Sequence, residues 1–244
     1  MGHRIYIGCA GWSLPKEQWA HFPEEGSHLE RYTARFPAVE INASFYRAIR
    51  PATYARWAET VPEGFRFAVK VPRQVTHVGR LQETGALDTF LPAVQALGEK
   101  LGPLLLQLPP SLALDVGTAR HFLQALRERF AGEVVCEARH GDWFTAEAEA
   151  LFQEFRIARV AADPPPFPEA GRPGGWAGLA YFRLHGSPRL YYSAYSPAFL
   201  ASLVPVLLEA ARSRPVWCIF NNTAAGAAIA DALRLMELIH RPNG

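Results

Sequence analysis

The chain has 244 residues, of which 49% are apolar and 20% are charged, and its formal net charge is +2. This composition excludes a disordered polymer and allows a large buried core, while the nearly balanced charge argues against a dedicated nucleic-acid binder. No apolar run reaches the roughly 18 residues that a membrane span needs, and the first residues lack a signal-peptide pattern, so we expect a cytoplasmic protein without membrane attachment.

Short apolar runs rich in β-branched and aromatic residues recur along the chain and predict strands. Between them, segments with apolar residues three and four positions apart predict helices. The strand pattern occurs at residues 5–11, 38–46, 66–72, 103–109, 133–139, 157–163, 179–186 and 216–222. The helix pattern occurs at residues 52–60, 87–101, 118–130, 145–155, 197–212 and 225–239.

Strands that alternate with helices indicate a parallel sheet built from βα units. Eight such strands in a chain of this length favour a single (β/α)8 barrel domain of the TIM type over residues 1–244. The alternative is an open, doubly wound α/β sheet, but the chain contains neither a GxGxxG motif nor a P-loop. The Pro- and Gly-rich stretch at residues 164–175 excludes a helix after the sixth strand, so we expect a loop in its place.

Polar residues gather near the carboxyl ends of the predicted strands. Side chains along a strand point alternately to the two faces of the sheet, and here one face is apolar and is expected to contact the helices. The other face should then form a polar cluster at the C-terminal mouth of the barrel, where such barrels have their active sites. Burying so many polar groups is costly unless they pair or serve a site. The expected cluster comprises Glu40, Asn42, Lys70, Gln107, Glu137, Arg139, Asp163, Arg183, His185 and one of Asn221 and Asn222.

The chain carries a series of short strings in order, which are GCAGW at 8–12, VEINASFY at 39–46, FAVKVP at 67–72, TH at 76–77, LQLP at 106–109, EARH at 137–140, WF at 143–144, RLHG at 183–186 and FNN at 220–222. Together they resemble the domain-of-unknown-function 72 family, also called YecE-like, over nearly the whole chain. The resemblance implies a barrel of the (β/α)8 type. It does not supply a reaction.

Two carboxylates and one amine in the cluster could carry catalysis. Glu40 and Glu137 could act as acid and base across the mouth, as paired carboxylates do in glycosidases. The alternative is that they form ion pairs with Arg139 or Arg183. Lys70 is one of only three lysines and lies in an apolar strand, so its amine could act as a base or form a Schiff base, unless it pairs with Glu40.

A third arrangement combines His185 with Asp163. Histidine is a natural acid/base group near neutral pH, and a carboxylate could orient its ring. Arg139 and Arg183 suit a ligand carboxylate or phosphate, because a guanidinium can bind either with two hydrogen bonds. The other candidate binding residues are Asn42, Tyr46, His77, Gln107, Asn221 and Asn222.

These residues predict an enzyme that carries out metal-independent acid/base chemistry on a polar, anionic small molecule, such as a sugar or a phosphorylated metabolite. No cofactor is predicted. One alternative is a non-catalytic module that binds an anionic ligand or nucleic acid. Another is a hydrolase or isomerase that depends on a divalent metal, although neither HxH nor HExxH spacing supports it. The ligands would then be Glu40, Glu137, Asp163, His185 and His77.

Overall fold

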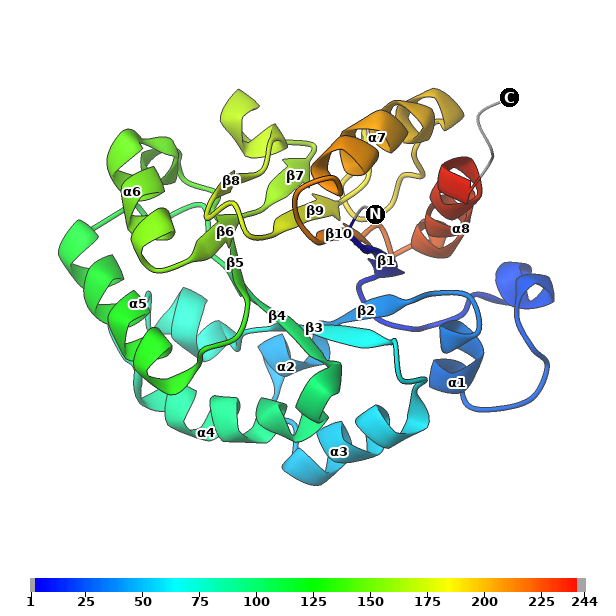
Figure 1. Ribbon diagram of the computed structural model, residues 1–244, viewed down its shortest axis with the longest axis horizontal. Coiled ribbons are helices and arrows are strands. Elements are labelled where there is room, and N and C mark those ends of the chain that lie inside the picture. The colour runs from blue at the N-terminus through cyan, green and yellow to red at the C-terminus, as the bar shows by residue number, and fades with distance from the viewer. Residues whose placement is uncertain (1–2, 241–244) are drawn as a thin grey trace.

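The computed structural model describes residues 3–240, and its strands surround the interior of the molecule with most helices outside them (Figure 1). The strands are β1 (Ile5–Cys9), β2 (Ala38–Ile41), β3 (Arg66–Lys70), β4 (Leu101–Gln107), β5 (Val134–Glu137), β6 (Ile157–Arg159), β7 (Ala161–Asp163), β8 (Gly174–Gly175), β9 (Ala180–Leu184) and β10 (Val216–Phe220). They form one sheet in the order β1–β10–β9–β7 and another in the order β2–β3–β4–β5–β6–β8. Neighbouring strands are parallel except for β8, which pairs antiparallel with β6. The chain therefore has an α/β fold with parallel sheets, as the alternating patterns predict.

The predicted strand segments all contain strands, and two of them differ in detail. The sixth segment is interrupted at Val160, so that β6 pairs with β5 while β7 pairs with β9. The second segment ends at Ile41, because Asn42 has helical backbone angles (φ −93°, ψ −17°) and starts the short helix α2 (Ala43–Tyr46). The predicted strand over residues 42–46 is therefore wrong, and its side chains do not alternate between two faces.

The helices lie between the strands as predicted, apart from their exact ends. The predicted helix over residues 87–101 divides at its end, because Gly98 adopts a left-handed conformation with φ of 55°. Between β7 and β9, the described residues contain one short 3-10 turn and β8 but no α-helix, as the Pro- and Gly-rich composition predicts. The helical elements are η1 (Lys16–His21), α1 (His28–Thr33), α3 (Pro51–Thr60), η2 (Gln74–Val78), α4 (Gly85–Val94), η3 (Gln95–Lys100), α5 (Val116–Arg129), η4 (Gly141–Phe144), α6 (Ala146–Glu154), η5 (Pro168–Gly171), α7 (Pro197–Ala210) and α8 (Ala227–His240).

The two faces of the strands belong to two different apolar clusters. The outer cluster packs strand residues such as Val69 and Phe182 against the helices. The inner cluster includes Ala38, Ala68, Leu105, Val135, Tyr181 and Ile219, with Trp217 stacked near Tyr6 and Tyr181. Two positions further along each strand, the alternation brings a polar residue to the same inner face. These polar residues are Glu40, Lys70, Gln107, Glu137, Arg183 and Asn221.

The two sheets meet where β1 and β2 end. Ala10 forms an isolated parallel bridge with Glu40, and the backbone N–H of Gly11 donates to the carbonyl of Glu40 at 2.9 Å. Among residues 3–240, no helix is long and apolar enough to cross a membrane.

Candidate active site

Arg183 in β9 is the centre of the polar cluster. Its side chain is only 1% exposed, and each of its guanidinium nitrogens donates to a carboxylate. Nε and Nη2 donate to the two oxygens of Glu40 at 3.0 and 2.7 Å, and Nη1 donates to Glu137 Oε2. The hydroxyl of Tyr181 also donates to Glu40 Oε2, at 2.8 Å. We call Glu40, Glu137, Tyr181 and Arg183 the ion-pair core.

The electrostatics of this core keep both partners charged. Burial alone would lower the pKa of Arg183, but the adjacent charges of Glu40 and Glu137 raise that pKa above its ordinary value. Burial alone would raise the pKa of Glu137, but the adjacent Arg183, His185 and Arg139 outweigh it and hold that pKa well below its usual range. Glu137 is therefore a fixed carboxylate near neutral pH, and its geometry matches the ion-pair alternative rather than a free acid or base.

Lys70, at the end of β3, is buried beside this core without joining it. Its side chain is 8% exposed, and its ammonium nitrogen makes no hydrogen bond or ion pair with any described residue. Nζ lies 3.9 Å from the centre of the Phe45 ring. Burial and the charge of Arg183 lower the pKa of Lys70 to about 8, against the opposing effect of the two carboxylates. The Lys70–Glu40 ion pair considered above does not form, because Arg183 occupies Glu40.

His185 lies between the core and the end of β10. Its Nε2 is 3.1 Å from Glu137 Oε1, and its Nδ1 is 3.0 Å from the amide nitrogen of Asn221. With the Asn221 amide in this orientation, Nδ1 accepts a hydrogen bond and Nε2 carries the hydrogen that is donated to Glu137. Asn221 is thus the inward-facing member of the two asparagines, and it fixes the ring of a candidate acid/base group.

The predicted role of Asp163 in orienting His185 is not supported by its position. Asp163 lies two positions after Ala161, which packs in the outer cluster, so its side chain is on the outer face. The inner face of this segment carries Ala158 and Val160. Only the backbone carbonyl of Asp163 contacts His185, as the acceptor of its N–H at 2.7 Å. Burial raises the pKa of the Asp163 carboxyl, partly opposed by Tyr195 and His185. Glu137 and Asn221 hold the ring instead.

Asn222 also lies apart from the inner face. It is fully buried, and its amide nitrogen donates to the carbonyl of Ser193 at 2.9 Å and to Asp231 Oδ2 at 2.7 Å. The same Asp231 oxygen accepts from the N–H of Tyr195 at 3.0 Å. Asn222 therefore joins α8 to the loop that follows β9, while its Oδ1 is buried without a hydrogen-bond partner among the described residues, and its contact with a ligand stays a prediction.

Arg139 forms the rim of the cluster next to an open cavity. Its Nε and Nη2 donate to Glu137 Oε1 at 2.9 and 2.8 Å, while its Nη1 makes no hydrogen bond with the described residues. The hydroxyl of Tyr191 is 3.5 Å from Nη2, and the Tyr191 ring meets His185 edge-on. Glu137, Arg139, His185 and Tyr191 line a cavity of about 360 Å³ together with residues of the 164–166 loop. The Nη1 hydrogens of Arg139 would be available to donate hydrogen bonds to a ligand in this cavity.

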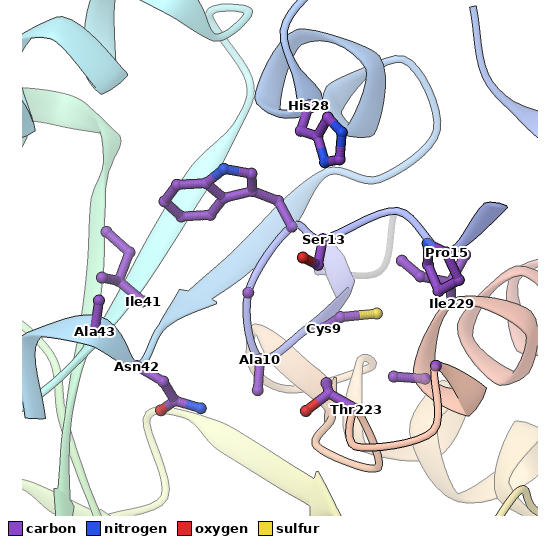
Figure 2. A pocket seen from close by; sticks show the side chains of 14 residues that line it. Cys9, Ala10, Ser13, Pro15, His28, Ile41, Asn42, Ala43, Thr223 and Ile229 are labelled. Carbon is purple, nitrogen blue, oxygen red and sulfur yellow. The ribbon is translucent and has the colours of Figure 1, made fainter. Parts of the chain in front are cut away.

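A second cavity, of about 510 Å³, opens beside the carboxyl ends of β1, β2 and β10 (Figure 2). Figure 2 shows His28 and Asn42 on opposite sides of it, with Cys9 and Ser13 between them. Asn42 Oδ1 is buried without a hydrogen-bond partner among the described residues, so this predicted binding residue has a free acceptor. Burial raises the pKa of the Cys9 thiol far above its ordinary value, which leaves that thiol unreactive.

The remaining predicted residues divide between the cluster and the surface. Gln107 lies on the inner face in register with Glu137. His77 packs edge-on against Phe45 and accepts or donates a hydrogen bond with Thr76 at 2.9 Å; burial and the charges of Lys70 and Arg139 lower its pKa. Tyr46 is 73% exposed and lies outside the cluster, because α2 replaces the predicted strand there.

The set of residues expected for a metal site is not assembled. Within residues 3–240, no group of three or more His, Cys, Asp and Glu side chains is placed so that it could hold a metal ion. Glu40 and Glu137 are instead bound to arginines.

Two residues of the site were not anticipated. Tyr181 could have been found, because it stands two positions before Arg183 and therefore shares its face. Phe45 could not be found from strand alternation, since the structure places it in a helix rather than in the predicted strand.

Comparison with known proteins identifies the family. The model of the family described as "Protein of unknown function DUF72" matches residues 6–244. UPF0759 protein YunF of Bacillus subtilis (strain 168) is 28% identical over 151 residues, which are 58% of this chain and only 52% of that relative, so the match spans about half of its length. A DUF72 family protein of Thermotoga maritima MSB8 is 26% identical with a TM-score of 0.81, over 98% of this chain and 100% of that one. One from Enterococcus faecalis V583, at 22% identity and a TM-score of 0.81 over 99% and 97% of the two chains, shares the fold. The chain belongs to the DUF72 family.

Proposed function

We propose that this protein is an enzyme that binds a small anionic molecule at the carboxyl ends of its parallel strands and uses Lys70 to take up and return a proton. The observation that carries the proposal is a buried amine without an anionic partner, next to two carboxylates that Arg183 already occupies. An amine with a pKa of about 8 is suited to proton transfer near neutral pH.

The charges around the cluster support an anionic ligand. Glu40 and Glu137 carry two negative charges, and Arg183 and Arg139 carry two positive ones, so these four side chains balance. A proton on Lys70 adds a positive charge that no described side chain neutralises. A bound carboxylate or phosphate would balance that charge and could accept hydrogen bonds from the unused Nη1 of Arg139.

We infer that the two sheets form one closed (β/α)8 barrel. The bridge between Ala10 and Glu40 joins β1 to β2. On the other side, β6 and β7 belong to one segment that pairs with β5 through its first half and with β9 through its second half. Closure would place Glu40, Lys70, Glu137 and Arg183 around one mouth, which is where barrel enzymes bind substrates.

The test is turnover of a panel of phosphorylated sugars and 2-oxo acids, followed by nuclear magnetic resonance. We expect the wild-type protein to convert at least one member, with kcat/KM rising with pH up to about 8 as Lys70 loses its proton. Lys70→Met should lower kcat/KM by about 100-fold or more. Lys16→Met, which replaces an exposed lysine, should leave it unchanged.

Two results would overturn the proposal. One is turnover that Lys70→Met leaves intact. The other is a panel member that raises the melting temperature of the wild-type protein but is never converted, which would favour the alternative of a non-catalytic binding module.

A further inference from the structure

We propose that Lys70 forms a Schiff base with a carbonyl compound that also carries a carboxylate or a phosphate. The inference rests on the proposed function, since it assigns a covalent step and a substrate class to the same site. It is a claim about bond formation at Nζ, whereas the proposed function requires only that this nitrogen exchange a proton.

The surroundings of Lys70 leave its nitrogen lone pair free to form a bond. A lysine in an ion pair is held in its protonated form and cannot attack a carbonyl carbon. Both carboxylates of the cluster are occupied by arginines, so the amine has no anionic partner, and its contact with the face of the Phe45 ring at 3.9 Å is a weaker attraction for the protonated form than an ion pair. The guanidinium of Arg183 also opposes protonation of the amine. Burial and charge together leave a usable fraction of neutral amine at neutral pH.

The surroundings of Lys70 also suit the expected adduct. A protonated imine keeps the positive charge of the lysine, so the field of Glu40 and Glu137 that now acts on Lys70 would act on it as well. The inner face beneath Lys70 is apolar, with Ala68 in the same strand. An apolar surface that excludes water favours loss of water from the initial adduct.

Arg139 is the candidate binding group for the acidic part of the substrate. Arg139 is the cluster's partly exposed cation, with 24% of its side chain accessible, and it faces a cavity of about 360 Å³ shared with His185. Its charge is among those that act on Lys70, which places both groups in one electrostatic environment. A compound with a carbonyl and an acidic group would bind Arg139 from this cavity through its acidic group, and its carbonyl would have to reach beyond the cavity wall to Lys70, which is not among the lining residues.

The step balances without any added oxidant or reductant. The Lys70 nitrogen forms a bond to the carbonyl carbon, and the carbonyl oxygen takes up a proton to give a carbinolamine. The nitrogen, which is cationic after the attack, gives up one of its two protons as the carbinolamine forms. A proton transferred to the hydroxyl group then lets that group leave as water, and the nitrogen lone pair forms the C=N bond of an iminium that keeps the second N–H proton. The rings of His185 and His77 lie at this end of the strands, and either can carry these protons.

The experiment traps the imine on the full-length protein. The protein is incubated at pH 7.5 with sodium cyanoborohydride, which transfers hydride to the C=N bond, and with one of three probes: pyruvate, glyceraldehyde 3-phosphate or uncharged glyceraldehyde. Trypsin cleaves after Lys70 only if that residue is unmodified, so trapping yields the uncut peptide 67–73. Lys16 and Lys100 serve as internal references in the same digest.

We expect one or both anionic probes to label Lys70 about tenfold faster than Lys16 or Lys100, because its neutral fraction is larger than that of an ordinary lysine. Arg139→Gln should slow labelling of Lys70 by the effective anionic probe about tenfold, with little effect on glyceraldehyde. Inorganic phosphate should slow the labelling of the wild-type protein. Circular dichroism and the melting temperature confirm that the variant is folded.

Labelling of Lys70 at the rate of Lys16 and Lys100 would overturn the inference, as would equal labelling by the charged and uncharged probes. These outcomes are separable from failure of the proposed function. Turnover that depends on Lys70 but yields no trapped adduct leaves proton transfer in place and removes the Schiff base. Selective trapping without turnover of any panel member keeps the Schiff base and removes the assigned acid/base reaction.

Discussion

Arg183 and Lys70 are two buried cations on the same inner face, and their surroundings are opposite. Arg183 donates from all three of its guanidinium nitrogens to Glu40 and Glu137. Lys70 has no such partner in the described chain and rests on an aromatic ring. Burial lowers the pKa of Lys70, whereas the paired carboxylates raise that of Arg183 despite its burial.

The difference separates a structural region from a reactive one. The ion-pair core has its charges satisfied within the protein, so it can orient neighbouring groups but has little capacity to exchange protons. Outside that core, Lys70, the Nη1 of Arg139 and the Oδ1 of Asn42 make no hydrogen bond with the described residues. Variants on the two sides should therefore differ in whether they mainly change the free energy of unfolding or the chemistry.

Arg183→Met should have the largest effect on stability. The variant leaves Glu40 and Glu137 buried without their shared cation, and breaking a buried ion pair from one side costs about 3–5 kcal/mol of unfolding free energy. Urea unfolding at pH 7, followed by circular dichroism, measures this loss. If Arg183→Met is too unstable to purify, Arg183→Lys keeps the charge but lacks the planar guanidinium that donates to both oxygens of Glu40 and to Glu137, and it should show a smaller loss.

Two comparisons test whether unpaired charge is the cause. Adding Glu40→Gln to Arg183→Met should recover part of the lost stability, because one of the stranded charges is removed. Arg139→Met should cost less than Arg183→Met, since Arg139 is partly exposed and Glu137 keeps its bond to Arg183. A loss below about 1 kcal/mol in Arg183→Met would show that the core does not stabilise the fold in this way.

A matched pair of tyrosines should give the next largest difference. Tyr181→Phe removes a buried hydroxyl that donates to Glu40 at 2.8 Å, and a hydrogen bond to a charged group contributes about 1.5–3 kcal/mol. Tyr191→Phe removes a hydroxyl at 3.5 Å from Arg139 on a side chain that is 37% exposed, so its effect should stay within about 0.5 kcal/mol. Equal losses of unfolding free energy would contradict the division between core and rim.

Strand alternation predicted the inner face well because its period is fixed by backbone geometry. The polar residues of β2, β3, β4, β5 and β9 each follow an apolar inner residue by two positions, so Glu40, Lys70 and Arg183 could be grouped from the sequence. The same rule failed where the backbone leaves the extended conformation. Asn42 starts a helix, and the predicted strand placement of Tyr46 failed with it.

Pairing within the cluster could not be predicted from the sequence. Each cation had several carboxylates as possible partners. Which ion pairs form depends on the distances between side chains on different strands, and strand alternation does not give these distances. In the structure, Arg183 forms ion pairs with both Glu40 and Glu137, and Lys70 forms none with the described residues. Likewise, the sixth strand segment is interrupted at Val160, and the side chain of Asp163 lies on the outer face. The hydrogen bonds to the His185 ring therefore come from Glu137 and Asn221.

Lys70→Met should stabilise the protein modestly, in contrast to every core variant. At pH 7 the wild-type amine is protonated in both states, and the folded state bears the unfavourable burial of that charge, so the variant should gain about 1–2 kcal/mol of unfolding free energy. Between pH 8 and 10.5 only the unfolded chain still binds this proton, so wild-type stability rises with pH and the advantage of the variant shrinks. Urea unfolding of both proteins at pH 7 and pH 10 measures the change, since the other titrating groups are common to both. Lys16→Met, at an exposed lysine, should show no such pH-dependent difference. A destabilised Lys70→Met protein, or a gain that is the same at both pH values, would mean that Lys70 is held by favourable contacts like Arg183, and the contrast between the two buried cations would not stand.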